Sequence, residues 1–215
     1  MKPCERLKTT SIAKKQVVAL TGLALVGFLL THLAGNFLML KSKDAFDSYA
    51  AFLAGHPLII PAEIGLAAFF LAHIVWGLRV TWENVRARPS RYDVDGSTEH
   101  RTWGAKTMRY TGSMTLIFLV VHITTFKFMG PEEGEGSLWE WVMFNFRHPL
   151  YMGFYVMALV ALGLHMSHGI KSAFQTLGLA HPRYTPLIEK AGFALPLALA
   201  AGFGTLPVWA FVRGG

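Results

Sequence analysis

Four histidines lie inside stretches that are otherwise made of apolar and small residues: His32, His73, His122 and His165. An ionisable side chain within a segment long and apolar enough to cross a membrane is a candidate functional site. Neutral imidazole can bind a transition metal, carry a proton or form an ordinary hydrogen bond. These residues therefore predict a metal centre, a proton relay or a hydrogen-bonded membrane core.

The four histidines belong to a pattern that occurs twice. A His-Pro-Leu triplet begins seventeen residues before His73 and seventeen before His165, and a glycine follows each histidine four residues later. A Thr-Gly pair begins eleven residues before His32 and eleven before His122. The small residues repeated in this way are Thr21, Gly22, Gly77, Thr111, Gly112 and Gly169. The chain thus reads as two similar helix pairs, each with two histidines.

The composition indicates a membrane protein. The 215 residues are 53% hydrophobic and 15% charged, with a mean hydropathy of +0.38, which is too apolar for an ordinary soluble domain. We expect an all-α, polytopic protein of one domain (1–215) with five transmembrane helices: a four-helix bundle and one peripheral helix without histidine. The expected spans are roughly 12–40, 57–85, 106–128, 149–177 and 186–212. Pro57 is expected at the start of the second, and KSKDAFDSYAAFLAG before it is expected to be a loop.

Several kinds of site can be set aside. The single cysteine, Cys4, allows no disulfide, no iron-sulfur cluster and no c-type haem attachment within the chain. The net charge is +7, but the basic residues are not distributed as in a nucleic-acid-binding surface, because lysine and arginine concentrate at particular helix ends. They gather before the first span, between the second and third, and near the end of the fourth. The positive-inside rule then predicts a cytoplasmic N-terminus and an extracytoplasmic C-terminus. The acidic residues Glu132, Glu133 and Glu135 would be extracytoplasmic.

Depth in the membrane pairs the histidines. With a rise of about 1.5 Å per residue, His32 and His122 fall in the outer half of the bilayer, and His73 and His165 in the inner half. Two imidazoles that face each other across a bundle can hold a haem by both axial positions, and such a haem transfers electrons because no position stays open. A single buried histidine taken alone is more often a hydrogen-bonded core residue than a ligand, but four at matched depths favour ligands. The repeated glycines would let a flat macrocycle approach the helices, or serve ordinary small-residue packing.

Other polar residues accompany the four histidines. His168 competes with His165, but the repeat aligns His168 with Trp76, so His168 is expected beside the haem or as an alternative ligand. Arg79 and Arg109, near the cytoplasmic helix ends, could pair with haem propionates or extend to the membrane interface.

Glu63 lies early in the second span, with no lysine or arginine near it in the sequence. Desolvation there would disfavour its charged form, which suits accepting a proton from a quinol. The alternative is a carboxylate stabilised by the helix N-terminus at the interface.

The sequence resembles the single-chain, two-haem cytochrome b membrane anchors of succinate:quinone and quinol:fumarate oxidoreductases. The segments that carry the resemblance are LLTHL, FLAHIVWG, RYTGSMTLIFLVVH and LGLHMSHGIKSAFQTLG, and it extends over all five spans. It implies two haems b in the inner (cytoplasmic) membrane of the cell. His32 and His122 would ligate the outer, distal haem, and His73 and His165 the inner, proximal haem.

The resemblance also implies partners. A flavoprotein subunit with FAD and an iron-sulfur subunit would dock on the cytoplasmic side, and electrons would pass between quinone and the fumarate/succinate couple, whose chemistry belongs to the partner subunits. Menaquinone is expected in preference to ubiquinone, and a dimer of complexes stays open. Some fumarate reductases of the family carry a glutamate used in proton transfer where this chain has Gly163.

Two alternative functions remain at the level of the sequence. One is the haem b subunit of a membrane hydrogenase or formate dehydrogenase, which would need other ligand spacings. The other is a haem-free anchor or transporter in which the histidines relay protons.

Overall fold

The structure, a computed structural model, describes residues 11–86, 103–131 and 136–214. Cys4, Glu132, Glu133, Glu135 and the basic residues before residue 11 and between 87 and 102 lie outside this part. All regular secondary structure in the described residues is helical, and five helices are long and apolar enough to cross a membrane. The prediction of an all-α polytopic membrane protein is confirmed.

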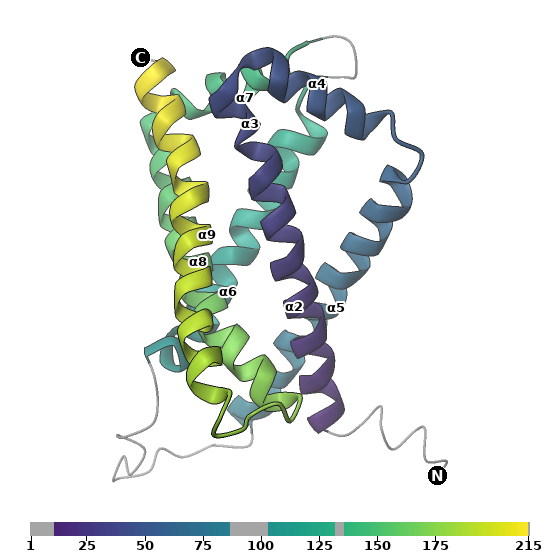
Figure 1. Ribbon diagram of the computed structural model, residues 1–215, viewed down its shortest axis with the longest axis vertical. Coiled ribbons are helices and arrows are strands. Elements are labelled where there is room, and N and C mark those ends of the chain that lie inside the picture. The colour runs from purple at the N-terminus through teal and green to yellow at the C-terminus, as the bar shows by residue number, and fades with distance from the viewer. Residues whose placement is uncertain (1–10, 87–102, 132–135, 215) are drawn as a thin grey trace.

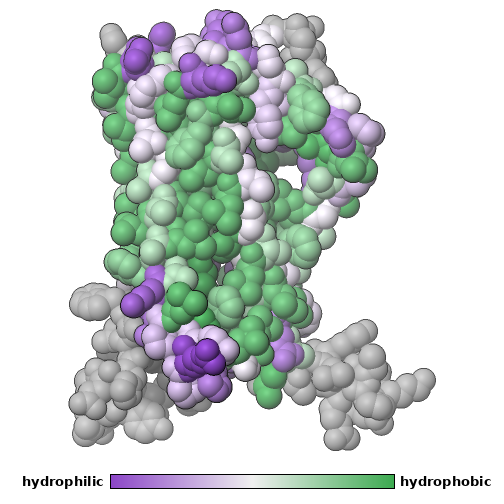
Figure 2. Space-filling view, in the orientation of Figure 1, coloured by the Kyte–Doolittle hydropathy of each residue, from purple (hydrophilic) through white to green (hydrophobic). Residues whose placement is uncertain are grey.

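The five long helices form an elongated bundle (Figure 1). They are α2 (Ser11–Asn36), α5 (Ile59–Arg86), α6 (Trp103–Ile123), α8 (Pro149–Thr176) and α9 (Thr185–Gly214). A break at Phe37 separates α2 from the short α3 (Leu38–Lys41), and α6 continues into a π-helical turn, η1 (Thr124–Phe128). Figure 2 shows a broad hydrophobic middle between two hydrophilic ends, as expected of a protein that crosses a bilayer.

The helices are not packed equally. Helix α8 packs against α9, α6 and α2, and it supplies many of the buried residues. Leu159, Leu162 and Met166 of α8 form a buried cluster with Leu199 of α9. In contrast, α5 packs chiefly against α2, has no buried residue, and leans away from α2 toward one end of the bundle (Figure 1).

Two further helices, α4 (Lys43–Ala54) and α7 (Leu138–Phe146), lie across the end of the bundle at which α2 finishes, which we call the capped end (Figure 1). The prediction of a loop over 41–55 is therefore wrong. Each helix begins at a serine whose hydroxyl accepts a hydrogen bond from a backbone N–H three residues later: Ser42 from Ala45 and Ser137 from Glu140, both at 3.1 Å. These serine N-caps stabilise the first turns of α4 and α7, and so the segment predicted as a loop folds as a helix.

Asp47 of α4 ties the two capping helices together. Its carboxylate accepts hydrogen bonds from the Ser137 hydroxyl at 2.6 Å and from the Trp139 backbone N–H at 2.9 Å. Lys43 also pairs with Glu140, and this hydrogen bond raises the pKa of the Lys43 ammonium above its ordinary value. Helices α4 and α7 are thus joined to each other by side-chain hydrogen bonds and an ion pair.

The two His-Pro-Leu triplets adopt different conformations. Pro149 is the first residue of α8, with His148 before it in extended conformation. Pro57 instead lies in a turn, and α5 begins two residues later at Ile59. The Leu58 backbone N–H donates to His56 Nδ1 at 3.2 Å and holds this turn, so the expected helix start at Pro57 is wrong.

Candidate functional site

The structure brings the four histidine rings together in two pairs. The rings of His32 on α2 and His122 on α6 have their centroids 5.9 Å apart at an interplanar angle of 87°. The rings of His73 on α5 and His165 on α8 are 6.3 Å apart at 78°. These are the pairs that depth in the membrane predicts, while their role as ligands stays a prediction.

The first Thr-Gly pair forms a seat for the His73 imidazole. His73 Nδ1 lies 3.1 Å from the Val18 carbonyl oxygen and 3.2 Å from the Thr21 hydroxyl oxygen. The Thr21 hydroxyl donates its own hydrogen to the Val17 carbonyl at 2.6 Å, so toward His73 it can only accept. Both neighbours of Nδ1 are therefore acceptors and Nδ1 carries the hydrogen, which leaves the lone pair of the neutral ring on Nε2.

The second Thr-Gly pair repeats this seat on α6. His165 Nδ1 is buried, and it faces the Met108 carbonyl without forming a hydrogen bond of normal geometry within the described part of the chain. Met108 stands three residues before Thr111, as Val18 stands three before Thr21. Thr21 and Thr111 are also the two buried polar residues of the described chain, at 6% and 7% exposure. The two Thr-Gly pairs thus lie at the Nδ1 edge of the His73 and His165 imidazoles.

The glycines of the two seats contact imidazoles, which the sequence did not reveal. A Cβ atom at Gly22 would lie 3.0 Å from His73 Cε1, and one at Gly112 would lie 3.1 Å from His165 Cε1. A side chain at either position would push the ring away. At Gly77, by contrast, a Cβ would meet nothing within 4 Å, and at Gly169 only a methionine methyl at 4.0 Å. There is open space beside those two glycines, and the approach of a flat macrocycle to them stays a prediction.

The pair formed by His32 and His122 has different surroundings. The Phe28 ring stacks on His32 with centroids 5.2 Å apart, and the Phe118 ring stacks on His122 at 5.5 Å. His122 Nδ1 lies 3.3 Å from the hydroxyl oxygen of Tyr155 on α8. Aromatic rings therefore hold both imidazoles, and a phenol marks the Nδ1 edge of one of them.

The two pairs fit axial coordination of a haem iron. Two imidazole nitrogens that share one metal ion at about 2 Å each put the ring centroids roughly 6 Å apart, close to the observed 5.9 and 6.3 Å. Within the described residues no three histidine, cysteine, aspartate or glutamate side chains gather around a metal position. Two imidazoles alone suit a metal that brings its other ligands with it, as the iron of a porphyrin does.

Glu63 forms an ion pair that its sequence context did not suggest. Lys127 Nζ of η1 lies 2.5 Å from Glu63 Oε1 at the start of α5, and the two side chains are 58% and 44% exposed. The π-helical turn that follows His122 presents this lysine, and such turns are frequent at functional sites. The pair links α5 to the end of α6, and a role of Glu63 toward quinol stays a prediction.

The remaining predicted residues lie near the other end of the bundle. Arg79 is exposed, with its guanidinium 5.3 Å from the Trp76 ring centroid, and Arg109 is exposed, 6.0 Å from the Tyr110 ring. Within the described residues neither arginine forms an ion pair with a carboxylate, so both are available to an anionic group. His168 is half-buried, one turn beyond His165 on α8.

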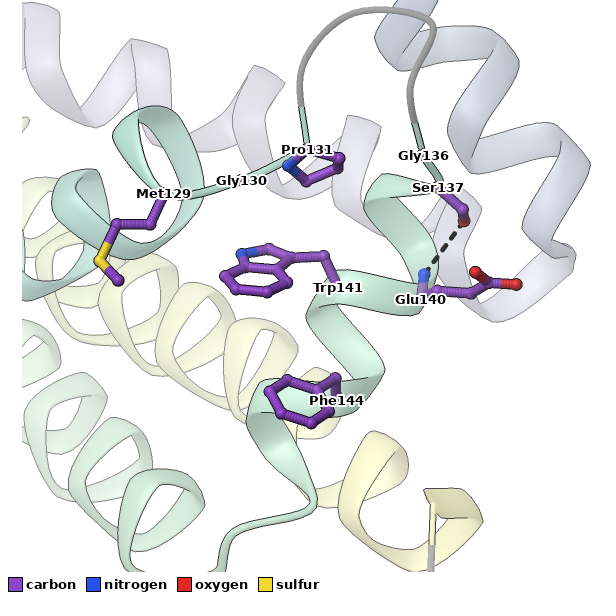
Figure 3. A pocket seen from close by; sticks show the side chains of 8 residues that line it. All are labelled: Met129, Gly130, Pro131, Gly136, Ser137, Glu140, Trp141 and Phe144. Carbon is purple, nitrogen blue, oxygen red and sulfur yellow. Dashed lines mark hydrogen bonds between the residues drawn. The ribbon is translucent and has the colours of Figure 1, made fainter.

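A separate hollow opens at the capped end between η1 and α7 (Figure 3). Its volume is about 470 Å³, and its lining includes Met129, Glu140, Trp141 and Phe144. The indole N–H of Trp141 donates to the Thr125 carbonyl at 3.0 Å, which fixes one wall. None of the four paired histidines lines this hollow.

Comparison with known proteins gives one full-length likeness. The chain is 24% identical over 203 residues to the succinate dehydrogenase cytochrome b558 subunit of Bacillus subtilis (strain 168). The likeness spans nearly the whole chain. It covers 92% of this chain and 96% of that protein. No protein-family model matches the sequence, and no solved structure matches the chain.

Proposed function

We propose that this chain is the membrane anchor and electron-transfer subunit of a succinate dehydrogenase or quinol:fumarate oxidoreductase complex. The full-length likeness to a succinate dehydrogenase cytochrome b subunit and the five apolar helices support the proposal. The observation that carries it is the arrangement of four imidazoles in two facing pairs, two of them with their Nδ1 edges turned into matching Thr-Gly seats.

Two haems b would be held by these pairs, one by His32 and His122 and the other by His73 and His165. When bound, haem b supplies one-electron transfer without an open coordination position. The chain's own contribution is orientation. The Val18 carbonyl and Thr21 hold the Nδ1 hydrogen of His73, so the lone pair of Nε2 would be left for the iron. On the cytoplasmic side Arg79 and Arg109 would pair with propionates.

The partners in this proposal are a flavoprotein subunit with FAD and an iron-sulfur subunit on the cytoplasmic face of the inner membrane. The dicarboxylate reaction belongs to those subunits, and this chain exchanges electrons with menaquinone. The N-terminus would be cytoplasmic and the C-terminus extracytoplasmic, so the capped end would face outward.

Glu63 would accept the proton of a quinol on a carboxylate oxygen near the capped end. Lys127 holds Oε1 at 2.5 Å, which leaves Oε2 as the proton acceptor. The same ion pair keeps the start of α5 next to η1, so the acceptor has a fixed position.

The absorption spectrum of the purified complex tests the proposal. We expect a dithionite-reduced spectrum of haem b, two haems per copy of this chain, and a flavoprotein and an iron-sulfur protein among the copurifying subunits. A haem-free preparation that retains activity would contradict the proposal and favour a histidine proton relay. Hydrogenase or formate dehydrogenase subunits in the preparation would assign the chain to another oxidoreductase.

A further inference from the structure

Tyr155 is a buried phenol whose hydroxyl lies next to one of the four paired histidines. Its hydroxyl oxygen lies 3.3 Å from His122 Nδ1 and accepts a hydrogen bond from the Tyr151 hydroxyl at 3.0 Å. Tyr155 is 4% exposed, and its ring is held by Phe118 and Phe146 with centroids 5.0 and 4.9 Å away. A phenol fixed in this way cannot turn its hydroxyl elsewhere without repacking the aromatic cluster.

The four imidazoles differ in what lies next to Nδ1, the ring nitrogen that points away from the metal when Nε2 is the ligand. Nδ1 of His73 faces a backbone carbonyl, whereas Nδ1 of His165 has no hydrogen bond of normal geometry in the described chain. His32 has the amide nitrogen of Asn36 at 3.4 Å from both ring nitrogens, which places the amide over the ring. Of the four, within the described residues, His122 is the one whose Nδ1 faces a phenol.

The internal repeat shows that this contact is a specialisation of one half. Tyr155 stands ten residues before His165, and Glu63 stands ten residues before His73. The two helices that follow the His-Pro-Leu triplets thus carry an oxygen-bearing side chain at the same register. In α8 it contacts His122, whereas in α5 it pairs with Lys127.

We propose that Tyr155, supported by Tyr151, is a positioning residue for His122 that sets the reduction potential of the haem between His32 and His122. The inference rests on the proposed function. The phenol oxygen accepts the Nδ1 hydrogen of His122, fixes the ring and directs the Nε2 lone pair toward His32. A hydrogen-bond acceptor at this atom makes imidazole a more basic ligand and favours the oxidised, more positive iron.

The test is a redox titration of the purified complex, followed optically and by electron paramagnetic resonance of the oxidised haems. We expect Tyr155→Phe to keep both haems, to raise the potential of one and to change its resonance signal. The other haem should be unchanged. Tyr151→Phe should shift the same haem by less and in the opposite direction, because it removes a second donor to the Tyr155 oxygen and leaves that oxygen a better acceptor for the Nδ1 hydrogen of His122. The shifted haem is identified by repeating the titration in a His73→Ala background.

Two further variants keep the test sharp. Tyr110→Phe on α6 is the matched control, since Tyr110 is 72% exposed, and it should move neither potential. Replacing Tyr155 by 3-fluorotyrosine keeps the shape and weakens the oxygen as an acceptor, so it should shift the potential in the same direction as Phe even if Phe loses the haem.

The inference is overturned if both haems are present and neither potential moves in Tyr155→Phe, or if the shift falls on the haem of His73 and His165. A 3-fluorotyrosine variant with the parental potentials would also overturn it. The absence of haem from the parental complex is a different outcome, which would remove the proposed function itself.

Discussion

Gly22→Ala is expected to weaken the binding of the haem that we propose between His73 and His165. The added Cβ would lie 3.0 Å from His73 Cε1, about 0.4 Å closer than an ordinary contact allows. Metal-ligand distances must be held to about 0.2 Å, so the ring moves by about twice that tolerance. Displacement of a ligand's support costs about 10-fold to 100-fold in metal affinity, or about 1.4 to 2.7 kcal/mol.

The assay is the haem content and reduced spectrum of the purified complex during titration with a competing apoprotein. We expect the variant to lose one of two haems at a concentration at which the parent keeps both. Gly27→Ala on the same helix is the control, because a Cβ there would meet nothing within 4 Å and both haems should stay. Equal haem retention in Gly22→Ala and the parent would refute the idea that the Thr-Gly pair seats the imidazole.

The remaining predictions concern other parts of the chain. His165→Ala should remove the same haem outright and leave the other, as counted by the haem-to-protein ratio; loss of neither would exclude His165 as a ligand. Glu63→Gln should retain both haems and abolish quinol oxidation measured with a menaquinol analogue, whereas normal turnover would remove Glu63 from the mechanism. Lys127→Gln should slow the same reaction less than Glu63→Gln, because the proton acceptor remains; an equal loss would show that the pair acts only as a unit. Asp47→Ala should lower the thermal stability of the complex, because it loses two hydrogen bonds to a carboxylate that together contribute roughly 3 to 6 kcal/mol; an unchanged melting temperature would contradict this role of the cap.

Much of the fold could be predicted because a bilayer constrains it strongly. Apolar runs of more than 18 residues can only become helices there, and the internal repeat together with helix rise puts two rings at each of two depths. The structure brings together His32 with His122 and His73 with His165.

The parts that escaped prediction depend on contacts between distant segments. The capping helices are short, and their start signal at Ser137 and Glu140 is weak beside the hydropathy of the spans. The partner of Glu63 stands 64 residues away in the sequence. The Thr-Gly repeat was visible, but only the packing of α2 against α5 shows that it touches an imidazole.

The unequal packing of α5 has a consequence for assembly. His165 is carried by the helix at the centre of the bundle, whereas His73 is carried by a helix that leans chiefly on one neighbour. A helix with few buried contacts opens at a lower free energy than the rest of a protein. Movement of α5 alone would therefore open a sideways path from the lipid for the planar prosthetic group that we propose between His73 and His165, while the other four long helices stay in place.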